Sequence, residues 1–82
     1  MIRLEVAYTE NAGRFYRGHL TVNGENIETF NWLHEVNEYL VEKGSKVIFP
    51  QGTDEGDIYE IQKKATDQVG FLVIAHDAMD IL

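Results

Sequence analysis

The 82-residue chain contains no cysteine, one proline and one serine. Without cysteine, neither a disulfide nor a thiolate-bound metal can reinforce the fold, so the burial of apolar side chains has to stabilise it. The single serine, Ser45, follows an expected helix and lies in no Gly-x-Ser-x-Gly sequence. Nucleophilic catalysis by serine or cysteine therefore lacks its usual residues, and no phosphate-binding glycine loop or cofactor motif is present. We expect no enzymatic activity and no cofactor.

Long apolar runs are also missing. The longest uninterrupted one extends from Phe71 to Ala75, far below the roughly 20 residues of a membrane-spanning helix. Arg3 and Glu5 interrupt the apolar stretch that a signal peptide would need near the N-terminus. We therefore expect a cytoplasmic protein without membrane contact, and the length predicts one compact domain, residues 1–82.

Positive charge is scarce and unevenly placed. Seven Lys and Arg stand against fourteen Asp and Glu, which gives a formal net charge of −7. All three arginines lie in the first 17 residues, so residues 1–24 carry a net charge of +1 and residues 25–82 a net charge of −8. A field of this sign repels nucleic acid and anionic membranes and attracts basic protein surfaces. We expect the partner to be a protein with a basic surface, and not nucleic acid itself.

Alternating side chains predict two strands near the N-terminus. Residues 1–8 place apolar side chains at every second position, which is typical of a half-buried strand. Residues 14–22 predict a second strand, in which Gly18 leaves a gap or marks a bulge. Its expected inward residues are Tyr16, Leu20 and Val22.

Asn23-Gly24 is the strongest local signal in the chain. This dipeptide between two strand-like runs favours a type I′ turn, because both positions then need a positive φ. The turn predicts a third strand, residues 25–29, in which Ile27 pairs with Leu20 and shares its buried face. The alternative is a helix that begins already at Asn26.

The remaining chain alternates between helical and strand patterns. Leu33, Val36 and Leu40 recur at steps of three and four, so residues 30–43 predict a helix. Thr29 or Asn31 would cap its start and Gly44 would follow its end. Residues 46–49 predict a short strand that ends at Pro50, residues 57–69 a second helix, and residues 71–75 a strand inside the sheet. The pattern leaves residues 76–82 unassigned.

The element order β-β-β-α-β-α-β predicts an α+β domain with a small mixed sheet. The sheet would begin with an antiparallel meander, and both helices would cover one face. A right-handed crossover would place the last two strands parallel to each other. The opposite face of the sheet would then be exposed to water or used for binding.

Carboxylates at helical spacing are the main candidate binding residues. Glu35, Glu38 and Glu42 recur at steps of three and four, so neighbours would lie about 5–6 Å apart on one side of a helix. That spacing is close to the separation of successive phosphates along a nucleic-acid strand. Asp54, Glu55 and Asp57 form a second acidic cluster, which Lys63 and Lys64 interrupt further along the chain. The competing interpretation is that both groups only keep the protein soluble.

Three other patterns suggest chemistry but lack residues that it requires. The basic and aromatic run Arg14 to His19 could stack nucleic-acid bases, but its two arginines are too few for the net charge, and pairing with nearby acids is the simpler expectation. His34 and Glu38 stand one helical turn apart without a third metal ligand. His76-Asp77 follows the last strand and is the best acid–base candidate, which makes a pocket there the signature of a small-molecule enzyme.

Aromatic side chains offer a further binding signal, since Trp and Tyr dominate the energetics of protein interfaces. Trp32, Tyr39 and Tyr59 are expected to lie inside or half inside so small a core. Trp32 and Leu33 cannot both face inward, and whichever of the two is exposed is the first choice as a binding residue.

In size, acidity and absence of motifs, the chain resembles small inhibitors that phages and mobile elements direct against host defence or nucleic-acid enzymes, such as anti-CRISPR and anti-restriction proteins. The resemblance is one of composition. It implies a non-enzymatic nucleic-acid mimic that blocks a basic surface, with Glu35, Glu38, Glu42, Asp54, Glu55 and Asp57 as the binding residues. The alternative is a structural or oligomerising domain, in which strand edges or the open sheet face form a homodimer.

Overall fold

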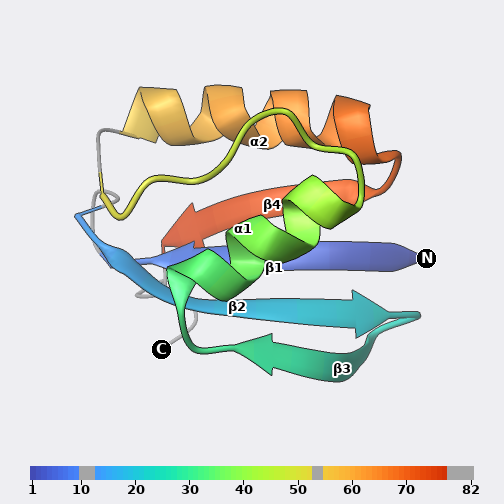
Figure 1. Ribbon diagram of the computed structural model, residues 1–82. Coiled ribbons are helices and arrows are strands. Elements are labelled where there is room, and N and C mark those ends of the chain that lie inside the picture. Colours follow the sequence, from blue (N-terminus) through green and yellow to red (C-terminus); the bar gives the residue numbers. More distant parts are fainter. Residues whose placement is uncertain (10–12, 53–54, 78–82) are drawn as a thin grey trace.

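The computed structural model describes residues 1–9, 13–52 and 55–77, which form a mixed sheet and two helices (Figure 1). The strand order is β3-β2-β1-β4; β1 pairs antiparallel with β2 and parallel with β4, and β2 pairs antiparallel with β3. This confirms the expected α+β class, the mixed sheet and the N-terminal meander. The elements are β1 (Ile2–Tyr8), β2 (Phe15–Val22), β3 (Glu25–Phe30), α1 (Leu33–Glu42), α2 (Glu55–Val69) and β4 (Leu72–Asp77).

Both helices cover the same face of the sheet, as expected. Leu4 and Val73 from the sheet, Val36 from α1, and Ile58 and Ala65 from α2 belong to one buried apolar cluster. In Figure 1, α1 crosses the middle of the sheet and α2 runs along the β4 side. The spacing of Leu33, Val36 and Leu40 therefore identified the buried side of α1.

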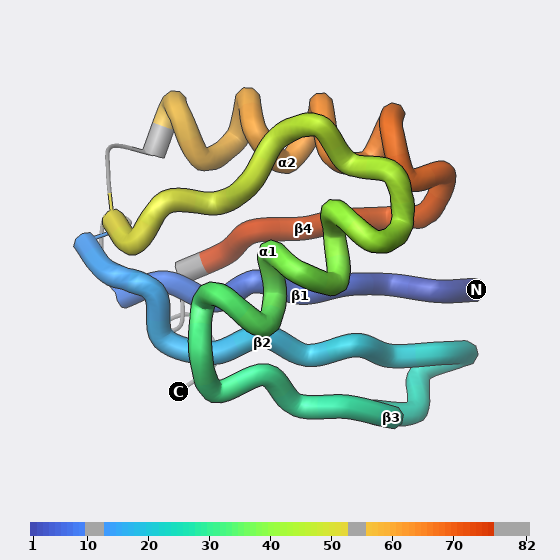
Figure 2. The backbone as a smooth tube through the Cα atoms, viewed as in Figure 1, coloured from blue at the N-terminus to red at the C-terminus, as the bar shows by residue number. Residues whose placement is uncertain are grey.

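The strand expected at residues 46–49 is wrong. This part of the chain runs as an irregular segment between α1 and α2 (Figure 2). The side-chain amide of Asn37 donates from Nδ2 to the carbonyl of Phe49 at 2.9 Å, and its Oδ1 accepts from the Phe49 N–H at 2.9 Å. The amide thus satisfies both backbone groups that a neighbouring strand would have paired. As a result, β4 is parallel to β1 rather than to residues 46–49.

We call residues 45–51 the inter-helix segment. Besides Asn37, the Tyr8 hydroxyl donates to the carbonyl of Pro50 at 2.7 Å, and the backbone N–H of Lys46 donates to Gln68 Oε1 at 2.6 Å. Near its end, the carbonyl of Gln51 accepts from the N–H of β2 residue Phe15 at 2.6 Å. The segment is therefore bonded to both helices and to two strands.

The turn after β2 forms as expected, but the register of β3 does not. Asn23 and Gly24 have φ values of 53° and 85°, the positive values that a type I′ turn requires. A register shift follows, so that Leu20 pairs with Glu28 rather than with Ile27. The extra residue of this bulge leaves Ile27 56% exposed, and the expectation that it shares the buried face is wrong.

A second bulge, in β2, makes the expected inward orientation of Tyr16 wrong. Ala7 pairs with Arg17 while Tyr8 pairs with Phe15, which leaves Tyr16 as the extra residue. Phe15 is consequently 7% exposed and Tyr16 49% exposed, the reverse of the predicted orientation of Tyr16.

Gly18 has a packing role, because a Cβ placed there would lie 2.7 Å from Val36 Cγ2. The missing side chain therefore allows α1 to approach β2.

Helix α1 begins three residues later than predicted, at Leu33. Thr29 and Phe30 are still paired with β2, so the hydrogen bonds of the sheet delay the helix. The N-cap residue is Trp32, which makes no side-chain capping hydrogen bond, and the expected caps Thr29 and Asn31 are wrong.

Side chains of α2 close one edge of the sheet. Thr66 Oγ1 accepts from the N–H of Val73 at 3.0 Å and donates to its carbonyl at 3.1 Å. Gln62 Oε1 accepts from the N–H of Ala75 at 2.7 Å. The edge of β4 is thereby occupied, whereas β3 forms the other edge of the sheet.

The contact between Asn37 and Phe49 yields a stability prediction. We expect Asn37→Ala to lower the free energy of unfolding by about 2–3 kcal/mol, because it leaves two half-buried backbone groups unpaired. Asn31→Ala, at an exposed asparagine, is the control and should change it by less than about 0.5 kcal/mol. Urea unfolding with an unchanged m-value measures both. Equal effects of the two substitutions would contradict the role assigned to Asn37.

Tyr8 yields a prediction about alkaline pH. Burial raises the pKa of its phenol, whereas in the unfolded chain a tyrosine titrates near about pH 10. Above that pH the unfolded chain loses the proton and the folded protein retains it, so the free energy of unfolding should fall as pH rises.

We expect Tyr8→Phe to flatten this fall, and to cost about 1 kcal/mol at neutral pH through the lost hydrogen bond to Pro50. Tyr16→Phe, at an exposed tyrosine, is the matched control. Unfolding curves between pH 8 and about pH 11 that keep the same slope in Tyr8→Phe and in the unsubstituted protein would refute this explanation.

Candidate protein-binding face

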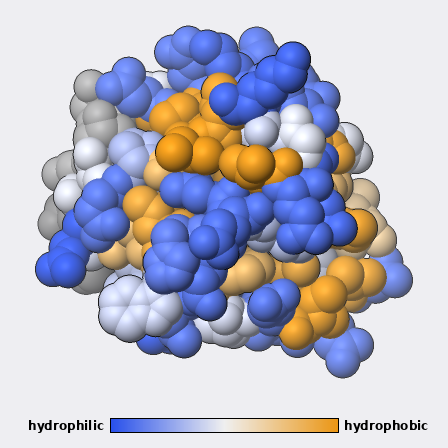
Figure 3. Space-filling view, viewed as in Figure 1, coloured by the Kyte–Doolittle hydropathy of each residue, from blue (hydrophilic) through white to orange (hydrophobic). Residues whose placement is uncertain are grey.

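The outer surface of the helical layer carries an apolar strip along the inter-helix segment. Figure 3, viewed from the same side as Figure 1, shows this strip between polar side chains above and below it. Val41 and Ile48 are 55% and 54% exposed, while Val47 and Ile61 are partly buried against the core. We call Val41, Val47, Ile48 and Ile61 the apolar ridge.

The ridge is a consequence of how the inter-helix segment is held. Asn37 fixes the backbone of Phe49, whose side chain is only 1% exposed. The neighbouring Ile48 consequently points outward. An apolar side chain on the surface is common in itself, but here four of them lie along one segment and the two helices beside it.

A groove follows each side of the ridge. The groove toward α1 has a volume of about 560 Å³ and the groove toward α2 about 400 Å³. Each groove includes two acidic residues, and we call these four residues the acidic rim. The rim consists of Glu38 and Glu42 on α1 and of Asp57 and Glu60 on α2.

The α1 side of the rim is the more negative one. Neither Glu38 nor Glu42 has an ion-pair partner within residues 1–9, 13–52 and 55–77. On α2, Glu60 Oε1 lies 3.2 Å from Lys64 Nζ, one helical turn away. Exposed pairs of this kind are weak, so Glu60 remains available to a partner. The neighbouring positive charge of Lys64 nevertheless makes the α2 side of the rim less negative than the α1 side.

Tyr39 indicates that the negative region continues onto β3. The pKa of its phenol is raised, first by burial and then by the charges of Glu28 and Glu42. Glu28 therefore lies in the same neighbourhood as the α1 acids. Glu28 is not among the predicted binding residues, because only the bulge in β3 places it opposite Leu20 on the helix-covered side of the sheet.

Only some of the predicted acidic residues lie beside the ridge. Glu38, Glu42 and Asp57 border the ridge. Glu35 is only half exposed and lines neither groove, so the three carboxylates of α1 do not act as one stripe along the ridge. Asp54 lies outside the described residues, and Glu55 is the first residue of α2. The contribution of each to binding stays a prediction.

The other sequence candidates occupy different parts of the surface. His34 and Glu38 line one groove, but the described residues contain no group of three or more His, Asp or Glu that could hold a metal ion. His76 Nε2 lies 3.7 Å from Glu5 Oε1, on the face of the sheet opposite the helices.

Within the described residues, the arginines of the basic strand form none of the expected ion pairs with acids. The guanidinium carbon of Arg17 lies 5.1 Å from the centroid of the Tyr16 ring. Neither Arg14 nor Arg17 has an ion pair within the described part of the chain.

Two of the three aromatic side chains expected in or near the core are exposed. Trp32 is 65% and Tyr59 55% exposed, because Trp32 precedes α1 as its N-cap residue and Tyr59 follows the inward Ile58 by one position. Tyr39 is half-buried and packs against the core. Between Trp32 and Leu33, Trp32 is thus the more exposed.

Within the described residues, no helix combines the length and the apolar character needed to cross a membrane. Comparison of the chain with protein-family models, with curated proteins and with solved structures finds no match.

Proposed function

We propose that this chain is a non-enzymatic inhibitor that binds a basic protein surface through the apolar ridge and the acidic rim. The observation that carries the proposal is the arrangement of the two: exposed apolar side chains in the centre, with carboxylates on both sides. Protein interfaces combine an apolar centre with a polar periphery in the same way. Apolar side chains of the partner would cover Ile48 and Val41, while its lysines and arginines would face Glu38 and Glu42.

The sign of the charge supports a nucleic-acid-binding surface as the target. Such a surface presents lysines and arginines to phosphates, and the rim carboxylates, together with Glu28, compete for the same cations. Charge attraction alone would weaken steeply with salt. The ridge adds a contribution to the binding free energy that salt does not screen, because this contribution comes from apolar area removed from water. We propose that the chain acts in the cytoplasm as a nucleic-acid mimic of the phage or mobile-element anti-defence type.

The test is a capture experiment followed by a competition assay. The tagged chain is incubated with bacterial lysate at low and high salt, and the captured basic protein is then purified and assayed for nucleic-acid binding. We expect addition of the chain to release the nucleic acid. Glu38→Gln combined with Glu42→Gln should weaken the interaction by about fivefold to tenfold at low salt, and much less at high salt. Ile48→Ser should weaken it at both salt concentrations.

The matched control is Glu25→Gln combined with Asp67→Asn, which removes the same charge from two exposed positions outside the ridge and rim. If the control pair weakens the interaction as much as the test pair does, the net charge and not the rim is responsible. If the captured protein still binds nucleic acid in the presence of the chain, the proposed inhibitory function is wrong.

The alternative function is an oligomerising domain that pairs through the edge of β3. The exposed Ile27 on that strand favours it. Glu25 and Glu28 oppose it, because two copies of the strand would bring like charges together. Sedimentation separates the two functions: a dimer that persists at high salt supports pairing through β3, and a monomer supports the inhibitor.

A further inference from the structure

A pocket apart from the two grooves lies where β2 begins and where the chain passes from β3 into α1. It has a volume of about 320 Å³, at the lower end of the roughly 300–1,000 Å³ range of small-molecule sites. No residue of the apolar ridge or the acidic rim lines it. The pocket is therefore separate from the proposed protein-binding face and needs its own explanation.

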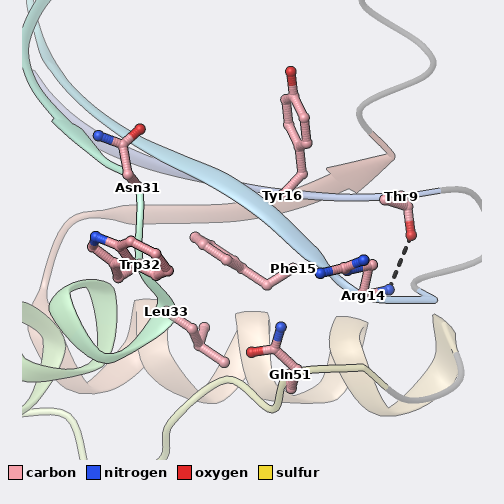
Figure 4. A pocket seen from close by; sticks show the side chains of 8 residues that line it. All are labelled: Thr9, Arg14, Phe15, Tyr16, Asn31, Trp32, Leu33 and Gln51. Atoms are coloured by element: carbon pink, nitrogen blue, oxygen red, sulfur yellow. Dashed lines mark hydrogen bonds between the residues drawn. The ribbon is translucent and has the colours of Figure 1, made fainter.

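Aromatic side chains supply the apolar surface of this pocket. Phe15 is 7% exposed and belongs to the core, whereas Trp32 is 65% exposed. Figure 4 shows Phe15, Trp32 and Arg14 around one space, with the amide of Gln51 directed into it and Tyr16 pointing to the other side of the strand. Because most of the Trp32 side chain is exposed, its indole can stack on a planar group.

The polar side chains of the pocket have no structural task within the described residues. The guanidinium of Arg14 and the carboxamides of Asn31 and Gln51 form no hydrogen bond or ion pair there. By contrast, the carboxamides of Asn37 and Gln62 are both used to bond the backbone. Arg14 and Gln51 are exposed, and polar side chains of this kind beside aromatic surface are the usual means by which a ligand site orients its ligand.

The backbone beneath these side chains is held in place before any ligand binds. The Arg14 N–H donates to Thr9 Oγ1 at 3.0 Å, and the Thr9 N–H donates to the Arg14 carbonyl at 2.9 Å. The Phe15 N–H donates to the carbonyl of Gln51 at 2.6 Å. A ligand would therefore order side chains only, which reduces the entropy lost on binding.

We propose that this pocket binds a small planar aromatic anion of the nucleoside monophosphate class. The indole of Trp32 would stack on the base, the guanidinium of Arg14 would bind the phosphate by two parallel hydrogen bonds, and the carboxamide of Gln51 would bond the edge of the base. A single phosphate suits the site better than a strand, because a polymer would extend over the negatively charged surface of the chain, which repels it.

The first experiment is a titration with adenosine 5′-monophosphate. Trp32 is the only tryptophan, so a change in its fluorescence reports on this pocket, and NMR shifts of the Phe15 amide and the Gln51 side chain locate the binding. We expect adenosine and inorganic phosphate, each alone, to bind at least about tenfold more weakly than the nucleotide, because each makes only part of the contacts. An equal response to inorganic phosphate would overturn the proposal, as would unshifted pocket resonances at millimolar nucleotide.

Variants then test the residues. Arg14→Gln should weaken nucleotide binding by about tenfold, and Arg3→Gln, which removes an arginine paired with Glu5 at 3.6 Å, should leave it unchanged. Trp32→Ala, followed by NMR, should weaken binding by about fivefold or more.

Equal effects of Arg14→Gln and Arg3→Gln would mean that only net charge matters, which overturns the site. Trp, Tyr and Arg are also enriched in protein interfaces. If Trp32→Ala abolishes protein capture while the nucleotide shifts no resonance, the pocket is a protein contact and the proposal is wrong.

Discussion

The two hydrogen bonds between the Asn37 amide and the backbone of Phe49 are the contact on which the helical layer depends. They allow residues without a strand partner to lie against the core, since buried backbone groups that stay unpaired are costly. With the backbone held, Phe49 fills the space between helices and sheet, and Ile48 is left outside. The apolar ridge, and both grooves beside it, follow from this one arrangement.

Polar side chains take the place of strand pairing at a second site as well. Thr66 and Gln62 bond the outer edge of β4, so a sheet of only four strands has one edge closed by its own helix. The other edge, β3, is protected differently, by glutamates at positions 25 and 28 and by a bulge, which discourage pairing with another chain. In the described part of the chain, side chains of α2 thus bond the backbone at one edge of the sheet in place of another strand.

The two proposed binding surfaces use opposite chemistry. The helical face combines apolar side chains with the carboxylates of Glu38 and Glu42, which suits a basic protein. The pocket around Trp32 combines aromatic rings with Arg14, which suits a small anion. This separation follows the uneven charge of the chain, because all three arginines precede residue 18 and most acids follow residue 24.

Periodicity determined the α+β class and the inward side of α1, and the Asn23-Gly24 dipeptide determined the turn and with it the meander. These features depend on local backbone preferences and on the burial of one face. Only the tertiary structure decided the bulges that expose Tyr16 and Ile27, the late start of α1, and the irregular course of residues 46–49. Each of these depends on a partner distant in the sequence. The candidate site divides in the same way: helical spacing identified Glu38 and Glu42, but the ridge beside them exists because Asn37 bonds Phe49 twelve residues away.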